Sequence, residues 1–425
     1  MAQNRKDFIV KTGAGILMTG IPGWLSANEN PDDQSALSDF IEGGAPDDEK
    51  YWKNIAKKYY HVAGDYINLE NGYYGLQSKP VLNAYLKNIE FVNKDSVRFA
   101  RRVFPDKSKE IKKELAAFLN VDDEEIIITR NATEALNIAI QGYPFNDGDE
   151  VVINQLDYFS MIEAFRMLEK RGNIRVASFE MPLLPKNEDE IVDIYASMIT
   201  QKTRVILLTH VSNINGLIVP VSKISAMAKQ KGIDVICDSA HALGQIEYSI
   251  KELGTDFIGM NLHKWIGNPI GAGVLYVKKD RIADLKPMFG DYANADDNIN
   301  KLAHFGTTPF AVIMTIPDSI TFHKLIGTEK KSARLHYLKK LWVDQLNQMP
   351  GVEVVTPVDK NLSCGIASFR MKNKKTAEMV DYLFKGKNIL TTGRALGTTG
   401  CIRVTPSIYN SSDDILNFVK AVQQG

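Results

Sequence analysis

The chain contains few cysteines, and none of them is spaced for a metal site or a disulfide framework. Among its 425 residues only Cys237, Cys364 and Cys401 are cysteines. Disulfide frameworks and zinc sites use closely spaced pairs such as C-x-x-C, and this sequence has no such pair. We therefore expect neither a disulfide-stabilised fold nor a metal centre.

Neither sign of charge is in excess, and long apolar runs are scarce. Lys+Arg and Asp+Glu each total 51. No summed field therefore favours nucleic acid or an anionic membrane surface. We expect small-molecule partners, and an anion site has to be built locally. Apart from the N-terminal run described next, no segment is long or apolar enough for a stable membrane span.

Residues 1–27 have the layout of an export signal. A basic stretch, Asn4–Lys11, precedes a Gly-rich and mildly apolar run, Thr12–Leu25. The segment is similar to a twin-arginine signal, with Lys6 where that pattern normally has its second arginine. We therefore expect export, to the periplasm in a bacterium. The alternative is a frayed amphipathic leader on a cytoplasmic enzyme.

The rest of the chain is long enough for two packed domains. Residues 28–50 are rich in Asn, Asp, Pro, Ser and Gly, a composition typical of a linker. From Tyr51 onward, short apolar runs alternate with stretches of helical periodicity. The predicted strands cover residues 125–129, 151–153, 205–209, 235–237 and 257–260, and the predicted helices cover residues 133–141, 161–171 and 224–231. Such runs are typical of strands buried on both faces of a mainly parallel sheet. We expect an α/β domain over residues 51–315.

The pattern changes over residues 316–425. One long helix is predicted from Ser319 to Gln348, followed by strands at 352–355 and 365–370 and a helix from Thr376 to Phe384. A last strand and helix are predicted between Arg403 and Val422. This mixture predicts a second, smaller α+β domain.

The strongest chemical signal joins a carboxylate to a lysine 26 positions later. Asp238 ends an apolar run in Asp234-Val-Ile-Cys-Asp-Ser-Ala-His241, and Lys264 lies in Asn261-Leu-His-Lys-Trp265. A carboxylate at a strand end can hold a pyridinium nitrogen protonated, while a lysine forms an imine with an aldehyde cofactor. The pattern indicates pyridoxal 5'-phosphate (PLP), carried on Lys264 with Asp238 at the ring nitrogen. The alternative is a buried helix-capping aspartate and an exposed lysine.

A second segment is suited to a phosphate group. Thr129-Arg-Asn-Ala-Thr133 places a strand, a short turn and a helix start in succession. Free backbone N–H groups at a helix start bind anions. Alone the signal is weak, because Asn131 or Thr133 could be a simple N-cap. Together with Asn261 and His263, it favours a phosphate seat at Ala132 and Thr133.

These segments resemble the class V aminotransferase family of fold-type I PLP enzymes, and within it most of all the isopenicillin N epimerases. The resemblance spans nearly everything after the linker. Its landmarks are Leu69–Gly75 with Lys79-Pro80, Arg98–Arg102, Asn131–Leu136, Asp238–Gly244, Asn261–Trp265 and Gly306–Pro309. The resemblance implies a fold-type I architecture and an enzyme acting on amino acids.

The resemblance also implies roles for single residues. Tyr158 matches the aromatic residue that stacks on the pyridine ring, and Asn213 matches the one that hydrogen-bonds the phenolic oxygen, with His241 close to the same edge. Thr307 matches a phosphate ligand donated by a second subunit, which implies a homodimer with shared active sites.

Two further residues are implied in substrate binding. Arg403 matches the arginine that binds the substrate carboxylate, a contact suited to a planar bidentate group, and Asn71 is expected beside the substrate. Each of these residues also has a purely structural alternative. Tyr158 could be a core aromatic residue and His241 a helix-start residue. The cluster of Arg98, Arg101 and Arg102 could be a solvated basic face.

The reaction is less evident than the cofactor. Cysteine desulfurases of this family place a nucleophilic cysteine on a loop well before the carboxylate-binding arginine, and this chain has no such loop. Cys401, two residues before Arg403, is expected to be a small buried residue. The leading hypothesis is Cα–H chemistry: Lys264 removes the proton, and Tyr158 returns one from the opposite face in an epimerisation or racemisation. The alternatives are an aminotransferase, a C–S lyase acting on a modified cysteine, and a non-catalytic PLP-binding sensor.

Overall fold

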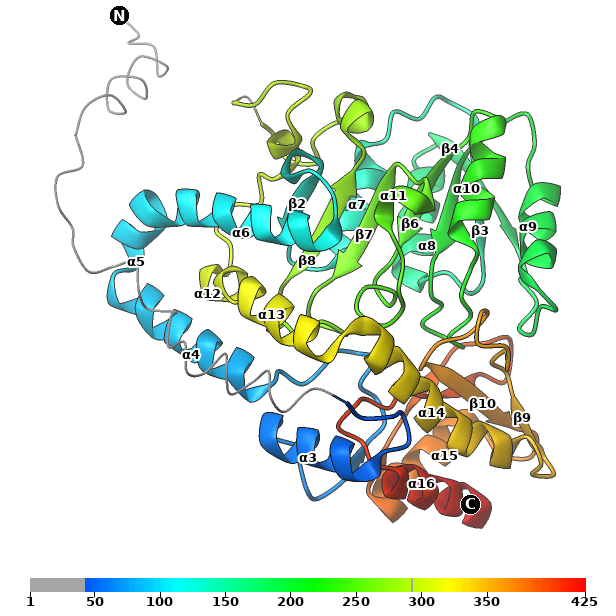
Figure 1. The fold of residues 1–425 in the computed structure, drawn as a ribbon. Helices are drawn as coiled ribbons and strands as arrows, with labels where there is room; N and C mark the ends of the chain where they lie inside the picture. The colour runs from blue at the N-terminus through cyan, green and yellow to red at the C-terminus, as the bar shows by residue number, and fades with distance from the viewer. Residues whose placement is uncertain (1–42, 292) are drawn as a thin grey trace, which may run out of the picture. The chain divides into compact units, whose positions relative to one another are not determined.

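A seven-stranded sheet, a four-stranded sheet and a two-stranded pair organise the part of the chain that the computed structural model describes, residues 43–291 and 293–425 (Figure 1). The expected export signal at residues 1–27 and most of the expected linker lie outside the described residues. Residues Gly43–Gly425 form a single compact unit.

The large sheet is mixed, with a parallel core. Its strands, in spatial order, are β2 (Ile126–Thr129), β8 (Gly273–Val277), β7 (Phe257–Asn261), β6 (Asp234–Asp238), β5 (Thr203–Thr209), β3 (Asp149–Asn154) and β4 (Ile174–Phe179). The strands from β7 to β4 run parallel, and β8 runs antiparallel to both β7 and β2. This confirms the expected α/β class, and it adds β4 and β8 to the five predicted strands.

Both faces of this sheet are covered, which explains its continuous apolar runs. In β5, Val205 and Leu207 pack into the cluster formed with α7 and α8, whereas Ile206 and Leu208 pack into a cluster on the opposite face. Strands that bury every second residue on each side read as unbroken hydrophobic stretches. The helices of this part are α4 (Lys79–Lys94), α5 (Ser96–Arg98), α6 (Phe104–Leu119), α7 (Ala132–Gly142), α8 (Phe159–Lys170), α9 (Glu188–Ser197), α10 (Val221–Gln230), α11 (Ile250–Leu253), α12 (Phe310–Met314) and α13 (Ile316–Ile326).

The C-terminal part forms its own layer of sheet and helices. Its antiparallel sheet has the order β12 (Thr392–Arg394), β13 (Cys401–Val404), β10 (Ala367–Met371) and β9 (Val352–Val354). The helices packed with it are α14 (Thr328–Leu346), α15 (Thr376–Asp381) and α16 (Ser412–Gln424). Its mixture of strands and helices agrees with the α+β character predicted for residues 316–425, and the predicted domain boundary at residue 315 stays a prediction.

The first described segment packs on this smaller part. Helix α3 (Glu49–Tyr59) begins two residues before the expected start at Tyr51, and Figure 1 shows it (blue) beside α16 (red). Glu49 pairs with the fully buried guanidinium of Arg334 in α14. Strand β1 (Ile67–Asn68) pairs in parallel with β11 (Ile389–Leu390). The first described segment therefore packs against C-terminal elements before the chain reaches the large sheet.

The single long helix predicted from Ser319 to Gln348 is wrong, because the structure divides it at Gly327. Helix α13 ends at Ile326 and α14 begins at Thr328, while Gly327 has φ 82° and ψ 142°. That conformation is open almost only to glycine, which has no Cβ. Helical periodicity continues across the break, so the apolar pattern alone did not reveal it.

Gly327→Ala is expected to lower the free energy of unfolding by about 1–3 kcal/mol, because alanine is strained at this φ and ψ. No atom lies within 4 Å of the added Cβ, so the effect isolates the backbone conformation. Thermal unfolding measures it. Gly290→Ala is the matched control, since its added Cβ also meets nothing and its φ is not positive. It should be neutral or slightly stabilising, and equal losses in both variants would contradict the strain argument.

Candidate active site

The site lies where the parallel strands of the large sheet end. Asp238 is the last residue of β6 and pairs in register with Thr209, the last residue of β5. Carboxyl ends of parallel strands meet at one edge of a sheet, where ligands of open α/β folds bind. Asp238 is buried, and its Oδ1 accepts a hydrogen bond from the Ala240 N–H at 2.9 Å. Burial raises the pKa of its carboxyl group, against the Ala240 N–H and the charge of Lys264. A cationic ring nitrogen would favour its ionised form.

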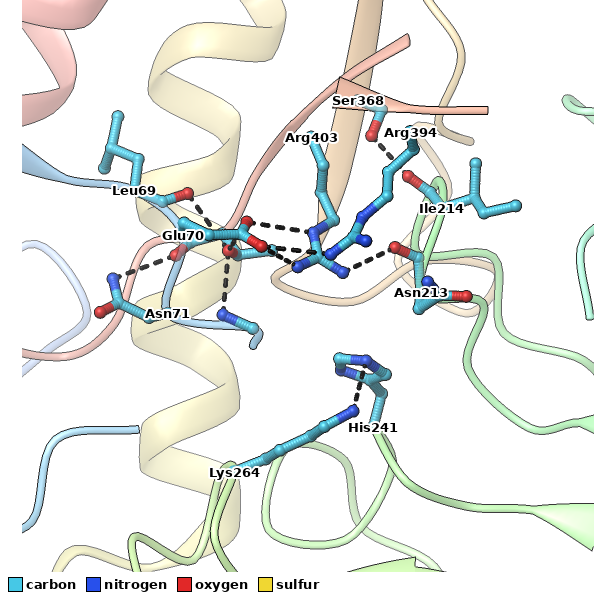
Figure 2. Close-up of polar contacts among 12 residues, drawn as sticks. Leu69, Glu70, Asn71, Asn213, Ile214, His241, Lys264, Ser368, Arg394 and Arg403 are labelled. Carbon is cyan, nitrogen blue, oxygen red and sulfur yellow. Dashed lines mark hydrogen bonds and ion pairs between the residues drawn. The ribbon is translucent and has the colours of Figure 1, made fainter. Parts of the chain in front are cut away.

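Lys264 follows β7 and points toward His241 (Figure 2). Its Nζ lies 2.9 Å from His241 Nε2. Loss of solvent lowers the pKa of the Lys264 amine to about 7; Arg403 and Arg394 act in the same direction, and Asp238 and Glu70 oppose them. A large fraction of this amine is therefore neutral near pH 7, as attack on an aldehyde requires.

His241 is buried and neutral. Desolvation, with the charges of Lys264, Arg403 and Arg394, holds the pKa of its imidazole well below 6.5. The neighbouring His263 is held differently, because its Nδ1 lies 2.8 Å from the Ala272 carbonyl and burial lowers its pKa to about 4. Both rings are therefore available as neutral hydrogen-bonding groups.

The predicted anion seat falls at the start of α7, where the first N–H group is already used; phosphate binding there stays a prediction. Asn131 is the N-cap, and its side chain accepts from the Glu134 N–H at 2.8 Å. The Ala132 N–H donates to Asn261 Oδ1 at 2.8 Å. Within the described residues no hydrogen bond uses the Thr133 N–H, which is left for an anion. A phosphate contact through the Ala132 amide would require its bond to Asn261 to open.

Glycine lets a strand pass close beneath this helix start. A Cβ at Gly273, the first residue of β8, would lie 2.6 Å from the carbonyl carbon of Asn131. No real Cβ contact is that short, so a side chain here would push the end of β8 away from the α7 turn. The close approach brings the anion seat next to the end of β7, from which Lys264 follows.

Several buried polar atoms around Lys264 and Asp238 have no hydrogen-bond partner within the described part of the chain. They include Asn213 Oδ1, His241 Nδ1 and Thr209 Oγ1. A buried polar atom left unpaired costs about 1–3 kcal/mol, and a ligand commonly supplies the missing partner. With an amine of lowered pKa, a buried carboxylate and a free helix start, these residues fit PLP.

Arg403 is bound by an internal carboxylate in the structure, and its predicted contact with a substrate carboxylate stays a prediction. Its Nη2 and Nε pair with Glu70, and its Nη1 donates to the Asn213 carbonyl at 2.9 Å. A second guanidinium, that of Arg394, donates to Glu70 Oε1 at 3.2 Å. Sequence reasoning missed both Glu70 and Arg394. The signals were present, since Glu70 lies in the Leu69–Gly75 landmark and Arg394 lies nine residues before Arg403.

Asn71 is buried and fully occupied. Its Oδ1 accepts from the Tyr409 hydroxyl at 2.7 Å, and its Nδ2 donates to the carbonyls of Asn68 and Thr405. These bonds hold the loop that carries Glu70. A direct contact between Asn71 and substrate stays a prediction.

Tyr158 and Thr307 are placed by the structure but their roles are not tested. Tyr158 is the residue before α8, just beyond the end of β3, and its ring meets Phe159 edge-on at 4.9 Å. Thr307 lies exposed in the segment that leads into α12. Stacking by Tyr158 and donation of Thr307 to a second subunit stay predictions.

All three cysteines are buried, as predicted. Burial raises the pKa of the Cys401 and Cys364 thiols to about 11 and that of Cys237 to about 12. A thiol nucleophile acts as its thiolate, so none of the three is suited to attack at neutral pH. In the described residues no group of three His, Cys, Asp or Glu side chains could hold a metal ion, and no helix is long and apolar enough to cross a membrane.

The fold and the site together define a fold-type I PLP enzyme, and comparison with known proteins identifies the family. Residues 81–418 match the model of the aminotransferase class-V family, so the chain belongs to that family of PLP-dependent enzymes. A probable cysteine desulfurase from Halalkalibacterium halodurans is 27% identical over 71% of this chain and 77% of its own length. Isopenicillin N epimerase from Streptomyces clavuligerus is 23% identical over 75% of this chain and 84% of its own length.

Solved structures show the same fold. A cysteine desulfurase from Thermococcus onnurineus superposes with a TM-score of 0.76 and is 21% identical, over 87% of this chain and 97% of its own. At such identity the likeness extends to the fold alone. The reaction has to be argued from the residues of the site.

The lowered pKa of Lys264 predicts how the apoprotein takes up its cofactor. The neutral amine reacts with the aldehyde, so the uptake rate at fixed PLP should rise with pH up to about 7 and then level off. A lysine of ordinary pKa, about 10.4, would keep gaining rate through pH 9. The growth of visible absorbance after mixing measures the rate. A rate that continues to rise steeply above pH 9 would contradict the lowered pKa.

Proposed function

We propose that this enzyme moves the Cα proton of an amino acid or a small amino-acid derivative, as an epimerase or racemase of the kind that its relative, isopenicillin N epimerase, is named for. The observation that carries the proposal is the contact between Lys264 and His241. Burial lowers the pKa of this lysine amine to about 7, so beside the neutral His241 it can accept a proton near pH 7.

The residues that would hold PLP come from different strand ends. Lys264 would carry it, Asp238 would pair with its ring nitrogen, Asn213 and His241 would contact its polar edge, and Thr133 would bind its phosphate. When bound, PLP acts as an electron sink that makes the Cα proton acidic. Burial raises the pKa of the Asp238 carboxyl group, and a cationic ring nitrogen held there would stabilise its ionised form.

Lys264 and His241 form the base side of the reaction. Once its amine is free, Lys264 can take a proton from Cα and hold it as an ammonium. His241 Nε2 is in position to accept a hydrogen bond from that ammonium, because burial keeps the imidazole neutral. The pair can therefore hold the removed proton on Lys264 Nζ. An epimerase also needs an acid on the opposite face of the substrate, and Tyr158 is our candidate.

Tyr158→Phe is expected to leave exchange of the α-proton with solvent largely intact while slowing stereoinversion by about a hundredfold or more, the size of a general-acid contribution. The two rates are measured together in deuterated water, by mass spectrometry and by chiral chromatography. Tyr195→Phe, a buried tyrosine whose hydroxyl accepts from Asn154, is the control. Equal loss of exchange and inversion would remove Tyr158 from the role of acid.

Cysteine desulfurases are frequent among the relatives, but the residues of this site are poorly suited to desulfuration. That reaction, in the cysteine desulfurases of this family, uses a nucleophilic cysteine on a loop, and the cysteines here are buried with raised pKa values. The segment that leads to Arg403 instead presents Arg394, close to Glu70. Transamination and C–S cleavage use the same Lys264 and Asp238, so experiment has to separate them from epimerisation.

The test mixes the holoenzyme with L- and D-amino acids and cysteine derivatives in deuterated water. Deuterium at Cα with the resting visible spectrum retained and both stereoisomers recovered would support the proposal. Release of a keto acid with conversion of the cofactor to its amine form would replace it by an aminotransferase. Release of sulfide or a thiol with pyruvate would replace it by a C–S lyase.

We also propose a homodimer in which Thr307 of one subunit reaches the phosphate of the other, and export of the folded enzyme through the signal at residues 1–27. The exposure of Thr307 supports the first proposal, and the basic and apolar layout of residues 4–25 supports the second. Sedimentation of the purified enzyme tests the homodimer, and fractionation of the producing cells tests export.

A further inference from the structure

Helix α14 carries two buried lysines that bind different segments of the chain. Lys339 donates to Ser363 Oγ at 2.7 Å, away from the site. Lys331, near the start of the helix, donates instead to the carbonyl of Trp265, the residue that follows Lys264. One end of α14 is therefore joined directly to the backbone that carries Lys264.

The amine of Lys331 is held by a second partner, the imidazole of His323. Lys331 Nζ lies 3.0 Å from His323 Nδ1, and His323 Nε2 lies 2.9 Å from Thr328 Oγ1. Burial, with the charges of Lys331 and Lys324, holds the pKa of His323 well below 6.5, so its ring is neutral. One nitrogen of a neutral imidazole accepts a hydrogen bond while the other donates. A chain of hydrogen bonds therefore runs from Thr328 through His323 and Lys331 to Trp265.

Trp265 also contacts α14 and the site through its side chain. It shares a buried apolar cluster with Leu335, one turn beyond Lys331 in α14. Its ring meets the ring of His241 edge-on, with the centroids 6.4 Å apart. His241 Nε2 in turn lies 2.9 Å from Lys264 Nζ. Trp265 is therefore the covalent neighbour of one partner in this contact and the packing neighbour of the other.

The backbone before Trp265 is fixed by a different segment. The Gly75 N–H donates to the His263 carbonyl at 3.1 Å. A Cβ at Gly75 would lie 2.4 Å from the carbonyl oxygen of Lys264, so this approach is open only to glycine. The loop is thus held at His263 by the segment before α4 and at Trp265 by α14. Of these two attachments, the one at Trp265 depends on a side chain that can be replaced.

Lys331 is not placed to react with an aldehyde cofactor itself, although burial lowers the pKa of its amine to about 7. It lines a cavity of about 30 Å³ together with Lys264. That volume admits about one or two water molecules, and it is too small for PLP. Lys331 is therefore suited to hold the loop rather than to carry the cofactor.

We propose that Lys331 is a positioning residue for Lys264: by holding the Trp265 carbonyl to α14, it keeps the Lys264 amine in contact with His241. The inference rests on the attachment of PLP to Lys264 and not on the reaction that follows. Without Lys331 the buried Trp265 carbonyl loses its donor, and such a group regains a partner only if the loop moves toward water. The Lys264 amine then becomes better solvated, so its pKa rises toward the ordinary value of a lysine.

Uptake of PLP by the apoprotein tests the proposal, and the growth of visible absorbance after mixing measures it. Lys331→Met keeps the length of the side chain and removes its donors. It is expected to slow uptake at pH 7 by about fivefold or more, because a rise of about one unit in the pKa of Lys264 lowers its neutral fraction by that factor. The rate should also keep rising beyond pH 8. Thr328→Val changes no charge and removes the acceptor of His323, so it should slow uptake by about two- to threefold.

The matched control is Lys339→Met, which removes a buried lysine of the same helix, one whose pKa burial lowers to about 8. It should lose stability in thermal unfolding, as Lys331→Met does, while its uptake still levels off near pH 7. Equal slowing of uptake in both variants would overturn the proposal, since loss of stability would then account for it. If Lys331→Met does not fold, unchanged uptake in Thr328→Val overturns it instead. The expected uptake rates together with no Cα exchange in the amino-acid panel would refute the proposed function alone.

Discussion

Lys264→Arg is expected to abolish covalent attachment of the cofactor and to reduce turnover by about a thousandfold or more, since both nucleophilic and proton-transfer roles are lost. A guanidinium stays protonated at all working pH values and does not form the bond to the aldehyde. The substitution keeps the positive charge near Asp238, so the loss reports on the amine itself. The mass of the protein after borohydride reduction shows attachment, and Cα exchange with a reactive amino acid shows turnover.

Lys339→Arg is the control for that experiment. Lys339 is also buried, and desolvation lowers the pKa of its amine to about 8, yet it donates to Ser363 rather than facing the site. It should keep both the covalent label and the activity. A label that survives in Lys264→Arg and disappears in Lys339→Arg would move the attachment site to Lys339.

Asp238→Asn is expected to lower turnover by between about a hundredfold and several thousandfold. Removing one partner of a buried ion pair costs about 3–5 kcal/mol, and each 1.36 kcal/mol in the barrier is a factor of ten in rate. Asp238 is buried at the end of β6, so no water replaces the missing charge. Asparagine can still accept the Ala240 N–H, and the local turn should survive. The rate of Cα exchange and the visible spectrum of the bound cofactor measure the effect.

Asp157→Asn separates the role of Asp238 from a general need for buried carboxyl groups. Asp157 lies near Asp238, but its oxygens accept from the backbone N–H groups of Asn154 and Thr209. Burial raises the pKa of this carboxyl to about 7, so much of it is already neutral at neutral pH. We expect reduced stability with less than about a tenfold loss of turnover. Similar catalytic losses in both variants would assign the effect of Asp238→Asn to structure.

Membership of the class V family leaves the reaction open for a physical reason. The family shares the residues that make a Cα bond labile, and the product depends on which group then takes or gives a proton. A probable cysteine desulfurase and isopenicillin N epimerase match this chain at 27% and 23% identity, so identity does not separate the two reactions. Here the deciding features are local: buried cysteines, a neutral His241 beside Lys264, and the Arg394–Glu70–Arg403 group.

The sequence by itself determined the class of fold and the cofactor. Strands β3, β5, β6 and β7 were predictable because burial on both faces produces continuous apolar runs. Short motifs at the end of β6 and just after β7 carry Asp238 and Lys264. The N-cap at Asn131 was recognisable because a capping bond joins residues three apart. Signals of this kind depend on neighbours along the chain.

Only the tertiary structure decided the features that join distant segments. Strands β4 and β8 were not predicted, although β8 carries a buried apolar run at Val274–Val277, and their pairing with β3, β7 and β2 places them in the sheet. Glu70 and Arg403 are 333 residues apart in the chain. No rule based on neighbouring residues predicts the ion pair between this glutamate and this guanidinium. The pKa of Lys264 likewise depends on burial and on the charges of Asp238, Arg403, Arg394 and Glu70, which arrive from separate elements. Capping and periodicity depend on residues that are close in the sequence, so the sequence predicts them. Charge pairing and desolvation arise only when folding brings remote residues together.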